Sequence, residues 1–385
     1  MKIDETIYLD HQATTPVHPD VFSEMEPYFG SNFGNPHSSS HSIGWRSNFA
    51  VENARKAVAD AISASPDEIF FVSGATEANN TAIKGLLRSW PSQRRTILAT
   101  TIEHKCVLAA ASSMRFHGIE TRKCAVNREG FVDLNSFEQE LMHNDVHLAS
   151  VMHTNNEIGT VQPIRDLAKI AHDHGTLFHT DAAQALIGAV INVDELDVDM
   201  LSLSSHKIYG PKGIGALYIR RDHQKLITPL LEGGGQESGI RSGTVPTALA
   251  VGFGQAASMA ARNHVQIREH LVGLCKLLEK ELRRIAPSAN INGPLIGLER
   301  HPGNLNIAFE NENGDDLISK MQPKLAISTG SACTSGIPEP SHVLMGIGLA
   351  ASVAESSIRF SPGIFTTNED IYSAVEIISE ALGGA

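Results

Sequence analysis

Cysteine and long apolar runs are scarce in this sequence, and each scarcity excludes a class of protein. The 385 residues include four cysteines, Cys106, Cys124, Cys275 and Cys333, and no two of them have CxxC spacing. This pattern gives neither a disulfide framework nor a zinc site, and we expect no bound metal. No apolar run reaches the ~20 residues of a membrane span, and the first residues lack the basic start and apolar core of a signal peptide. We therefore expect a cytoplasmic protein without membrane association.

Positive charge is also in deficit. The formal net charge is -12, so we expect no direct binding to nucleic acid. The chain has neither a Walker A sequence nor a GxGxxG motif, which excludes the usual mononucleotide and dinucleotide fingerprints. Hydrophobic residues make up 42% of the chain and charged residues 19%, as in an ordinary soluble globular protein.

Short apolar runs alternate with helical patterns through the first half of the chain. We predict strands at 68–72, 96–100, 147–152 and 176–179, and helices at 49–62, 76–87 and 163–172. Apolar strands separated by helices indicate an α/β fold with a mostly parallel sheet that is covered on both faces. In such sheets ligands bind at the carboxyl ends of the strands.

The pattern changes near residue 265, where a long charged helix is predicted. A chain of this length is long for one hydrophobic core, so we expect two domains. The predicted large domain spans 15–262. The predicted smaller α/β domain combines 1–14 with 263–385.

A candidate catalytic lysine follows one predicted strand. The segment Ser204-Ser205-His206-Lys207 comes directly after the apolar run 199–203. Lysine amines become nucleophilic when desolvation lowers their pKa, and they then condense with carbonyl compounds as Schiff bases. A surface lysine after a strand is the alternative, so other segments have to decide between the two interpretations.

Three further motifs follow predicted strands. The turn 73–77 joins a strand to a helix N-terminus, where Thr76 and backbone N–H groups can bind a phosphate; a plain N-cap is the alternative. Asp181 can hold the protonated nitrogen of a pyridine cofactor, and Gln184 can donate to an adjacent ring oxygen, or Asp181 can cap a helix. His104 can stack on a planar cofactor and move protons, or be structural.

The sequence His172-Asp173-His174 ends a helix, where histidine suits the negative dipole end, so we assign no metal there.

Two residues in the last part of the chain complete the set of candidates. Cys333 lies in a loop of small residues that leaves a thiol accessible, whereas the other three cysteines are interpreted as inert packing residues. Arg359 lies in a strand between apolar residues, where a guanidinium favours a bidentate anion such as a substrate carboxylate. An incidental loop thiol and a structural ion pair are the respective alternatives.

Together these motifs resemble one family, the NifS/IscS-type cysteine desulfurases. These are pyridoxal-phosphate (PLP) enzymes of the aspartate-aminotransferase fold, class V subgroup. The resemblance runs from about Tyr8 to Phe365. Its motifs are Gly34-Asn35-Pro36-His37-Ser38, Ser73-Gly74-Ala75-Thr76-Glu77-Ala78-Asn79-Asn80, Glu103-His104-Lys105, His153-Thr154-Asn155-Asn156-Glu157-Ile158-Gly159, Asp181-Ala182-Ala183-Gln184, Ser205-His206-Lys207-Ile208-Tyr209-Gly210-Pro211-Lys212-Gly213, Gly233-Gly234-Gly235-Gln236-Glu237, Arg241-Ser242-Gly243-Thr244 and Gly330-Ser331-Ala332-Cys333-Thr334-Ser335. The chain departs from the family where Asn-Asn is replaced by His11-Gln12.

The resemblance implies a large domain with a seven-stranded, mostly parallel sheet, and a role for each candidate in binding PLP. Lys207 would hold PLP as a Schiff base, with His104 stacked on the ring and Asp181 on the ring nitrogen. Gln184 would contact the ring hydroxyl. The phosphate would be held by four residues: Ala75, Thr76, Ser204 and His206. Lys212 is the rival Schiff-base lysine, but it lies past the strand end, inside a glycine-rich loop.

The resemblance also implies the partners and the reaction. Thr244 would reach the phosphate site of a neighbouring subunit, which makes a homodimer with shared active sites. Asn155 and Arg359 would bind the carboxylate of the L-cysteine substrate. Lys207 and His104 would move protons, and Cys333 would take the sulfur as a persulfide and pass it to an acceptor protein serving iron–sulfur clusters, tRNA thiolation or DNA phosphorothioation.

Two other functions fit parts of the pattern. A selenocysteine lyase or another class V PLP aminotransferase would share the cofactor site, although a transaminase does not need Cys333. A non-catalytic sulfur-carrier or scaffold subunit on the same fold is the second alternative. Four intact residues argue against it: Lys207, Asp181, His104 and Cys333.

Overall fold

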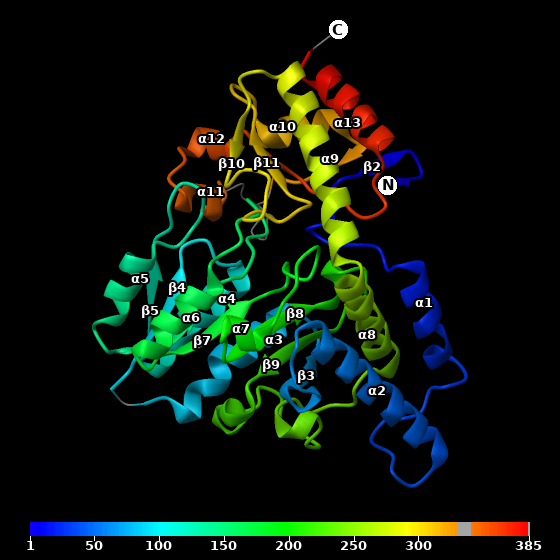
Figure 1. Cartoon of the computed structure of the whole chain (residues 1–385), viewed down its shortest axis with the longest axis vertical. Coiled ribbons are helices and arrows are strands. Elements are labelled where there is room, and N and C mark those ends of the chain that lie inside the picture. Colours follow the sequence, from blue (N-terminus) through cyan, green and yellow to red (C-terminus); the bar gives the residue numbers. More distant parts are fainter. Residues whose placement is uncertain (92, 330–339, 384–385) are drawn as a thin grey trace.

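The computed structural model describes residues 1–91, 93–329 and 340–383. A larger part holds the central sheet, and a smaller part, built around the long helix α9 (His264–Ile285), stands above it in the view of Figure 1. No helix in these described residues is long and apolar enough to cross a membrane.

The central sheet has seven strands in the order β3-β9-β8-β7-β6-β4-β5. Their bounds are β3 Ile69–Val72, β4 Thr96–Thr100, β5 Glu120–Cys124, β6 Val146–Ser150, β7 Leu177–Asp181, β8 Met200–Ser204 and β9 Gly215–Ile219. Strands β5, β4, β6, β7 and β8 are parallel neighbours, and β9 runs antiparallel to both β8 and β3. The expected mostly parallel α/β sheet is confirmed, with β9 as the exception that the sequence patterns did not identify.

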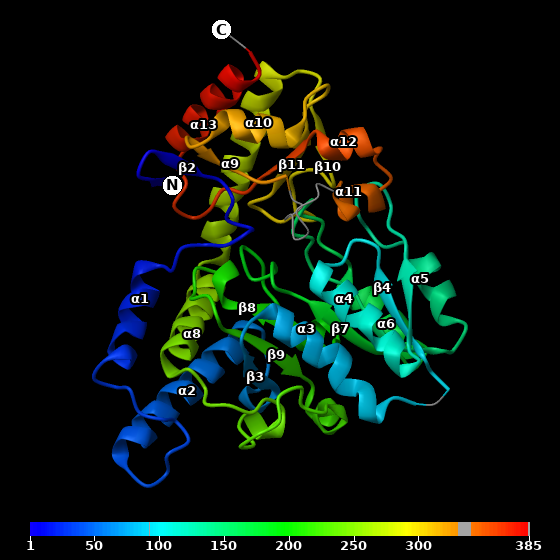
Figure 2. The same ribbon diagram turned by 180° about the vertical axis from the view of Figure 1, so that it is seen from behind.

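Both faces of this sheet are covered, because successive strand residues enter different apolar clusters. Phe70 and Val72 pack with helices α3 (Ala75–Lys84) and α4 (Lys105–Ser113). Ile69 and Phe71 pack with residues from α2 (Ser42–Ala61), α6 (Ile164–Asp173) and α8 (Thr247–Arg262). Figure 2 shows α3 and α4 on the face that is turned away in Figure 1. The continuous apolar runs of the strands follow from this double burial.

The helices cover the sheet and build the smaller part. Their bounds are α1 Pro19–Met25, α2 Ser42–Ala61, α3 Ala75–Lys84, α4 Lys105–Ser113, α5 Leu134–Leu141, α6 Ile164–Asp173, α7 Val193–Leu196, α8 Thr247–Arg262, α9 His264–Ile285, α10 Gly314–Met321, α11 His342–Gly346, α12 Ala351–Glu355 and α13 Asn368–Ala381. The helix predicted over 76–87 ends earlier than expected, since the chain continues after Lys84 as a 3₁₀ turn.

Two small sheets lie beside α9 and α13. One is antiparallel in the order β10-β11-β13, with bounds Asn290–Asn292, Leu305–Ala308 and Ser357–Phe360. The other joins the N-terminal strands β1 (Lys2–Ile3) and β2 (Thr6–Tyr8) to β12 (Leu325–Ala326). The start of the chain is therefore built into the smaller part, and the next residues cross back to the sheet rim.

Candidate active site

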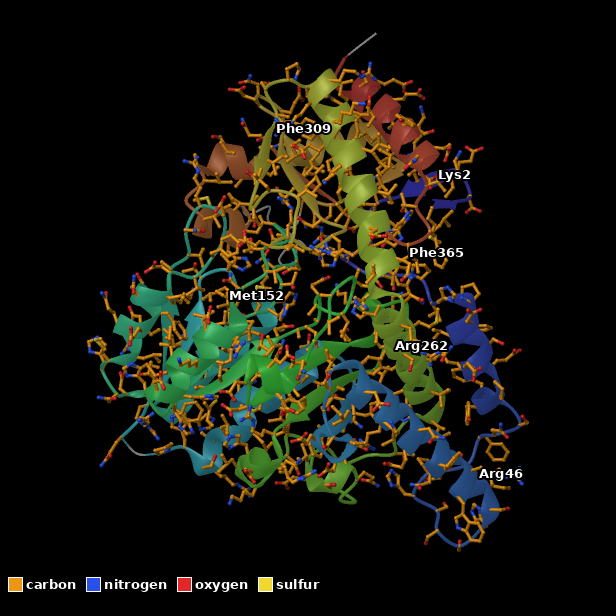
Figure 3. The ribbon with its side chains drawn as sticks, in the orientation of Figure 1. Lys2, Arg46, Met152, Arg262, Phe309 and Phe365 are labelled. Carbon is orange, nitrogen blue, oxygen red and sulfur yellow. The ribbon has the colours of Figure 1, made fainter. Side chains whose placement is uncertain are left out.

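The carboxyl ends of the central strands open into a cavity of ≈440 Å³. Its walls come from Ser73, Gly74, Ala75, Thr76, Glu77, His104, Cys106, Met152, Thr154, Asn156, Asp181, Ala183, Gln184, Ser204, His206, Lys207, Lys212 and Gly213. Met152 marks the position of this wall between the two parts of the molecule (Figure 3). The structure thus brings together eight predicted residues: Ala75, Thr76, His104, Asp181, Gln184, Ser204, His206 and Lys207.

Lys207 lies on a 3₁₀ turn directly after the fully buried strand β8. The turn is tight, since a Cβ at Gly210 would lie 2.1 Å from the Ser205 hydroxyl oxygen. The Nζ of Lys207 donates to the carbonyl oxygens of Gln12, at 2.5 Å, and Ala13, at 2.8 Å. Burial, aided by the positive charge of Arg359, lowers the pKa of Lys207 to about 8. An amine in this state is neutral for part of the time near pH 7, as a Schiff-base nucleophile requires.

Asp181 ends strand β7 and points its carboxylate into the cavity wall. It accepts hydrogen bonds from Asn79 Nδ2 at 2.7 Å and from the backbone N–H of Ala183 at 3.0 Å. A turn follows Asp181 in place of a helix, so the helix-cap interpretation is excluded. Gln184 Nε2 donates to the Gln12 carbonyl at 2.9 Å.

His104 is the N-cap of helix α4. Its Nδ1 accepts from the backbone N–H of Cys106 at 3.2 Å and lies 2.9 Å from the Cys106 sulfur. Burial lowers the pKa of His104, which favours a neutral ring that can lie flat against a planar cofactor.

Cys106 and Asn79 are site residues to which the sequence assigned no role in the site, although Asn79 belongs to a motif of the resemblance. The Asn79 amide donates to Asp181 and also to the Cys106 sulfur, at 3.2 Å. Burial raises the pKa of the Cys106 thiol to about 11, so this thiol remains protonated although it lines the cavity. A polar Asn one helical turn after Thr76, on the face that also carries Ala78 and Ala82, was the available signal.

The part of the cavity at the N-terminus of α3 is suited to an anion. No side chain caps the N-terminus of α3, so its first backbone N–H groups face the cavity. Strand β9 approaches this turn closely, because a Cβ at Gly215 would lie 2.8 Å from the Gly74 Cα. The His206 ring contacts Thr14 Oγ1 at 3.0 Å, and burial lowers its pKa to about 4, so the ring is neutral.

A salt bridge also stabilises the turn that precedes α3. Glu77 accepts from the backbone N–H of Ser73 at 2.7 Å and from Arg241 Nε at 2.9 Å. Arg241 belongs to the same loop as Thr244, which is exposed and does not line the cavity of its own chain. The predicted role of Thr244 at a partner's site remains a prediction.

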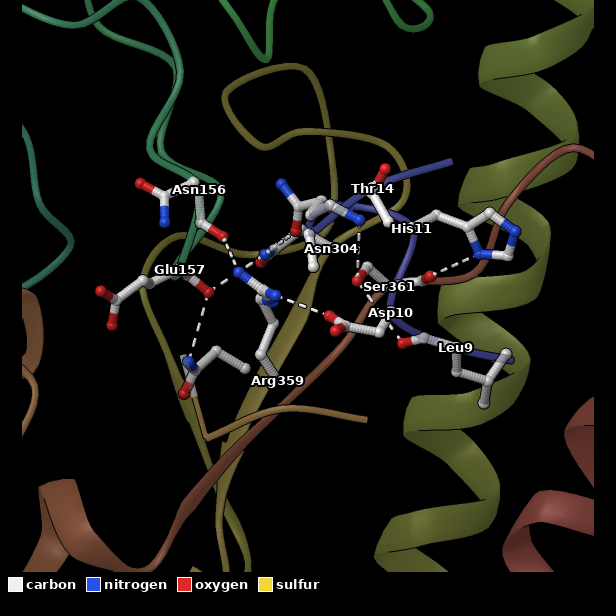
Figure 4. Close-up of polar contacts among 12 residues, drawn as sticks. Leu9, Asp10, His11, Thr14, Asn156, Glu157, Asn304, Arg359 and Ser361 are labelled. Atoms are coloured by element: carbon white, nitrogen blue, oxygen red, sulfur yellow. Dashed lines mark hydrogen bonds and ion pairs between the residues drawn. The ribbon is translucent and has the colours of Figure 1, made fainter. Parts of the chain in front are cut away.

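Arg359 is buried on strand β13 and already has a carboxylate partner (Figure 4). Its Nη2 donates to Asp10 Oδ1 at 2.6 Å and its Nη1 donates to the Asn156 carbonyl at 2.8 Å. The alternative interpretation of Arg359, an internal ion pair, is therefore realised in the structure. Arg359 is near enough to Lys207 to lower the pKa of that amine.

Asn155 is fully buried and its side chain is engaged inside the protein. Its Nδ2 donates to the Ile102 carbonyl at 3.0 Å, and its Oδ1 accepts from the backbone N–H groups of Glu157 and Ile158. Its neighbour Asn156 lines the cavity instead. The predicted contact of Asn155 with a substrate carboxylate remains a prediction, and Cys333 lies outside the described residues.

The two histidines of the segment 172–174, where the sequence assigns no metal, contact carboxylates. His172 Nε2 contacts Asp199 Oδ2 at 2.9 Å, and the hydrogen bonds of His172 to Asp199 and Asp197 raise its pKa. Across the described residues, no group of three or more His, Cys, Asp or Glu side chains could hold a metal ion.

The residues of the cavity fit PLP. An uncapped helix N-terminus suits the phosphate, a carboxylate suits the ring nitrogen, and an amine with a lowered pKa lines the same cavity. The volume lies within the range of ordinary cofactor pockets.

A lysine on the rim of a mostly parallel seven-stranded sheet, facing such an anion site, defines a PLP-dependent transferase of the aspartate-aminotransferase fold. The model of the family Aminotransferase class-V matches residues 7–373, and the chain belongs to that family. The mitochondrial cysteine desulfurase of Eremothecium gossypii is 46% identical over 374 residues, which cover 97% of this chain and 75% of that protein.

Two further comparisons agree. The cysteine desulfurase IscS of Rickettsia typhi is 44% identical over 97% of this chain and 90% of its own length. Among solved structures, a NifS-like protein matches with a TM-score of 0.90 and 34% identity, covering 98% of this chain and 99% of that one. The family, the fold, the PLP cofactor and the desulfurase class expected from the sequence are thereby confirmed.

Proposed function

We propose that this chain removes sulfur from L-cysteine by means of Lys207, His104 and Cys333, giving L-alanine and a persulfide on Cys333. The observation that carries the proposal is the Lys207 amine, whose pKa is lowered to about 8 beside a cavity that fits PLP. Ala75, Thr76, Ser204 and His206 would hold the phosphate, with Asp181 on the ring nitrogen, Gln184 on the ring hydroxyl and His104 against the ring.

When bound, PLP supplies an electron sink that weakens the bond between the Cβ and the sulfur of cysteine. Lys207 takes up and returns the proton of the substrate Cα, because its amine is neutral for part of the time near pH 7. Asp181, held by Asn79, keeps a proton on the ring nitrogen. Arg359 orients the substrate by its carboxylate, with Asn155 as the second predicted contact.

Sulfur transfer then depends on Cys333. Its thiolate attacks the substrate sulfur, so that a sulfur–sulfur bond forms while the bond from Cβ to sulfur breaks. The electron pair of the broken bond stays with the carbon, which takes up a proton and leaves as alanine. The persulfide leaves by thiol exchange with an acceptor protein, and iron–sulfur cluster assembly, tRNA thiolation and DNA phosphorothioation are the consumers that fit this product.

We propose a homodimer in the cytoplasm as the working form, with Thr244 completing the phosphate site of its partner. The support is a set of exposed apolar side chains on the segment 22–49, which runs from within α1 to the first part of α2 and is here called the α1–α2 surface. Its side chains are 44–71% exposed: Phe22, Phe29, Phe33, Ile43, Trp45 and Phe49. Six large apolar side chains that are exposed within one segment favour an interface there. Each protomer would divide into a large domain at 15–262 and a small domain at 1–14 and 263–385, supported by the pairing of β2 with β12.

Replacement of the proposed nucleophile tests the reaction. The variant Cys333→Ala should retain the absorbance of bound PLP and lose sulfide release from L-cysteine by at least about a hundredfold, because general acid–base groups cannot replace a nucleophile. Cys124→Ala is the matched control, since Cys124 is buried at the end of β5 and outside the cavity. Sulfide release that persists in Cys333→Ala would exclude Cys333 as the sulfur acceptor and favour a lyase-type enzyme that breaks the bond from Cβ to sulfur without a protein thiol.

A further inference from the structure

The pairing of Arg359 with Asp10 joins two segments that lie far apart in the sequence (Figure 4). Asp10 follows strand β2, whereas Arg359 lies on β13. The Asp10 segment is fixed by its neighbours, since the backbone N–H of His11 donates to the Ser361 carbonyl at 3.0 Å and Tyr8 donates its hydroxyl to the Asp10 carbonyl at 3.1 Å. The segment therefore holds a carboxylate beside the guanidinium.

The same segment continues to the catalytic lysine. Two residues after Asp10, the carbonyl of Gln12 accepts from the Lys207 amine, and its side-chain oxygen accepts from Asn304 Nδ2 at 2.5 Å. The Asp10 carboxylate is close enough to raise the pKa of Lys207, against the effect of Arg359. The Asp10–Arg359 pair thus lies at the edge of the reaction site and not in a remote part of the core.

The pair is unequal in exposure and incomplete in hydrogen bonding. The Arg359 side chain is 4% exposed and that of Asp10 is 19% exposed, so the carboxylate is the more accessible partner. Arg359 Nε is buried and has no hydrogen-bond partner within the described part of the chain. A buried guanidinium requires an anion, and one N–H of this guanidinium remains available for another acceptor.

We propose that Asp10 is an internal carboxylate that neutralises Arg359 between turnovers and is displaced by the α-carboxylate of the substrate. The inference rests on the proposed function, in which Arg359 binds that carboxylate. Exchange of one carboxylate for another keeps the guanidinium neutralised throughout, so it avoids a buried unpaired charge. Asp10 therefore acts as a positioning residue that keeps the guanidinium paired and competes with the substrate carboxylate for it, whereas a ligand with a neutral amide does not displace it.

Removal of the Asp10 charge tests this exchange. In Asp10→Asn holoenzyme, L-alanine should bind about tenfold more tightly than in the wild type, because the competing and repelling charge is gone. L-alaninamide, which lacks the carboxylate, should bind equally well to both proteins. Titration calorimetry measures both affinities. The KM for L-cysteine should also be lower in Asp10→Asn than in the wild type.

Two comparison variants separate this effect from a general disturbance. Asp20→Asn makes the same substitution at a side chain that is 71% exposed and should leave all affinities unchanged. In an Arg359→Gln background, Asp10→Asn should no longer tighten L-alanine, because the effect acts through the guanidinium. Should Asp10→Asn not fold, a crystal structure of the wild type with L-alanine should show Asp10 beyond the ~4 Å range of an ion pair with Arg359.

The outcomes distinguish a failure of this inference from a failure of the proposed function on which it rests. Unchanged or weaker binding of L-alanine in Asp10→Asn, or an intact Asp10–Arg359 pair in the liganded structure, would overturn the role of Asp10. A wild-type enzyme that binds L-alaninamide as tightly as L-alanine would instead overturn the carboxylate role of Arg359.

Discussion

The amine of Lys207 depends on carbonyl groups that are remote in the sequence. Gln12 and Ala13 accept its hydrogen bonds, and the surrounding protein lowers its pKa to about 8. Only the neutral amine attacks the aldehyde of PLP, so cofactor uptake should follow the neutral fraction. The reactivity of Lys207 therefore depends on its buried surroundings, which lower its pKa, more than on its residue type.

This environment gives a pH prediction. The rate at which cofactor-free protein takes up PLP should rise from pH 6 and level off above about pH 8, because the lowered pKa of Lys207 is then passed. Stopped-flow absorbance measures the rate, and Lys212→Ala, which removes the exposed rival lysine, should show the same profile. A rate that continues to rise to pH 10 would mean an amine with an ordinary pKa.

At the scale of elements, two backbone segments must approach each other to form the anion site. A Cβ at Gly215 would lie 2.4 Å from the Leu203 carbonyl oxygen and 2.8 Å from the Gly74 Cα. The strand β9 can therefore support the turn before α3 only if residue 215 has no side chain.

The variant Gly215→Ala should displace that turn, weaken PLP binding by about tenfold or more and lower the free energy of unfolding by ~1–3 kcal/mol. Gly273→Ala is the matched control, because a Cβ there meets no atom within 4 Å on helix α9. It should leave PLP binding unchanged and raise stability by ~0.5–1 kcal/mol. Equilibrium dialysis and urea unfolding measure the two effects, and normal PLP affinity in Gly215→Ala would contradict this view of the turn.

At the scale of the whole molecule, the site of one chain is incomplete if Thr244 serves its partner. The α1–α2 surface projects from the larger part, with Arg46 at its outer end (Figure 3). Phe49→Asp and Trp45→Asp should produce monomers in sedimentation experiments and lower PLP occupancy, because a buried charge at an interface is costly.

Tyr372→Asp on α13, where the side chain is 50% exposed and outside the α1–α2 surface, should leave the dimer intact. Monomers that bind PLP as well as the dimer does would exclude shared sites. Dimers that persist in both α1–α2 variants would place the interface elsewhere.

The sequence predicted the fold and the cofactor site well because both depend on local patterns. The run 96–100 became β4 with the same bounds, and the candidates that follow strands met at one rim, as the geometry of parallel sheets requires. The Asp10–Arg359 pair and the Gln12 carbonyl could not be predicted, since they join segments that only the fold brings together. Cys106 was assigned to packing because its helix neighbours are apolar, and the pattern does not say which face lines a cavity.

Borohydride reduction of the holoenzyme, followed by peptide mapping, tests most directly whether Lys207 holds PLP. The reagent fixes the cofactor to the lysine that carries it, and mass spectrometry locates the modified peptide. We expect the modification on Lys207 alone. A modification on Lys212, or no modified lysine in protein that contains PLP, would contradict the account.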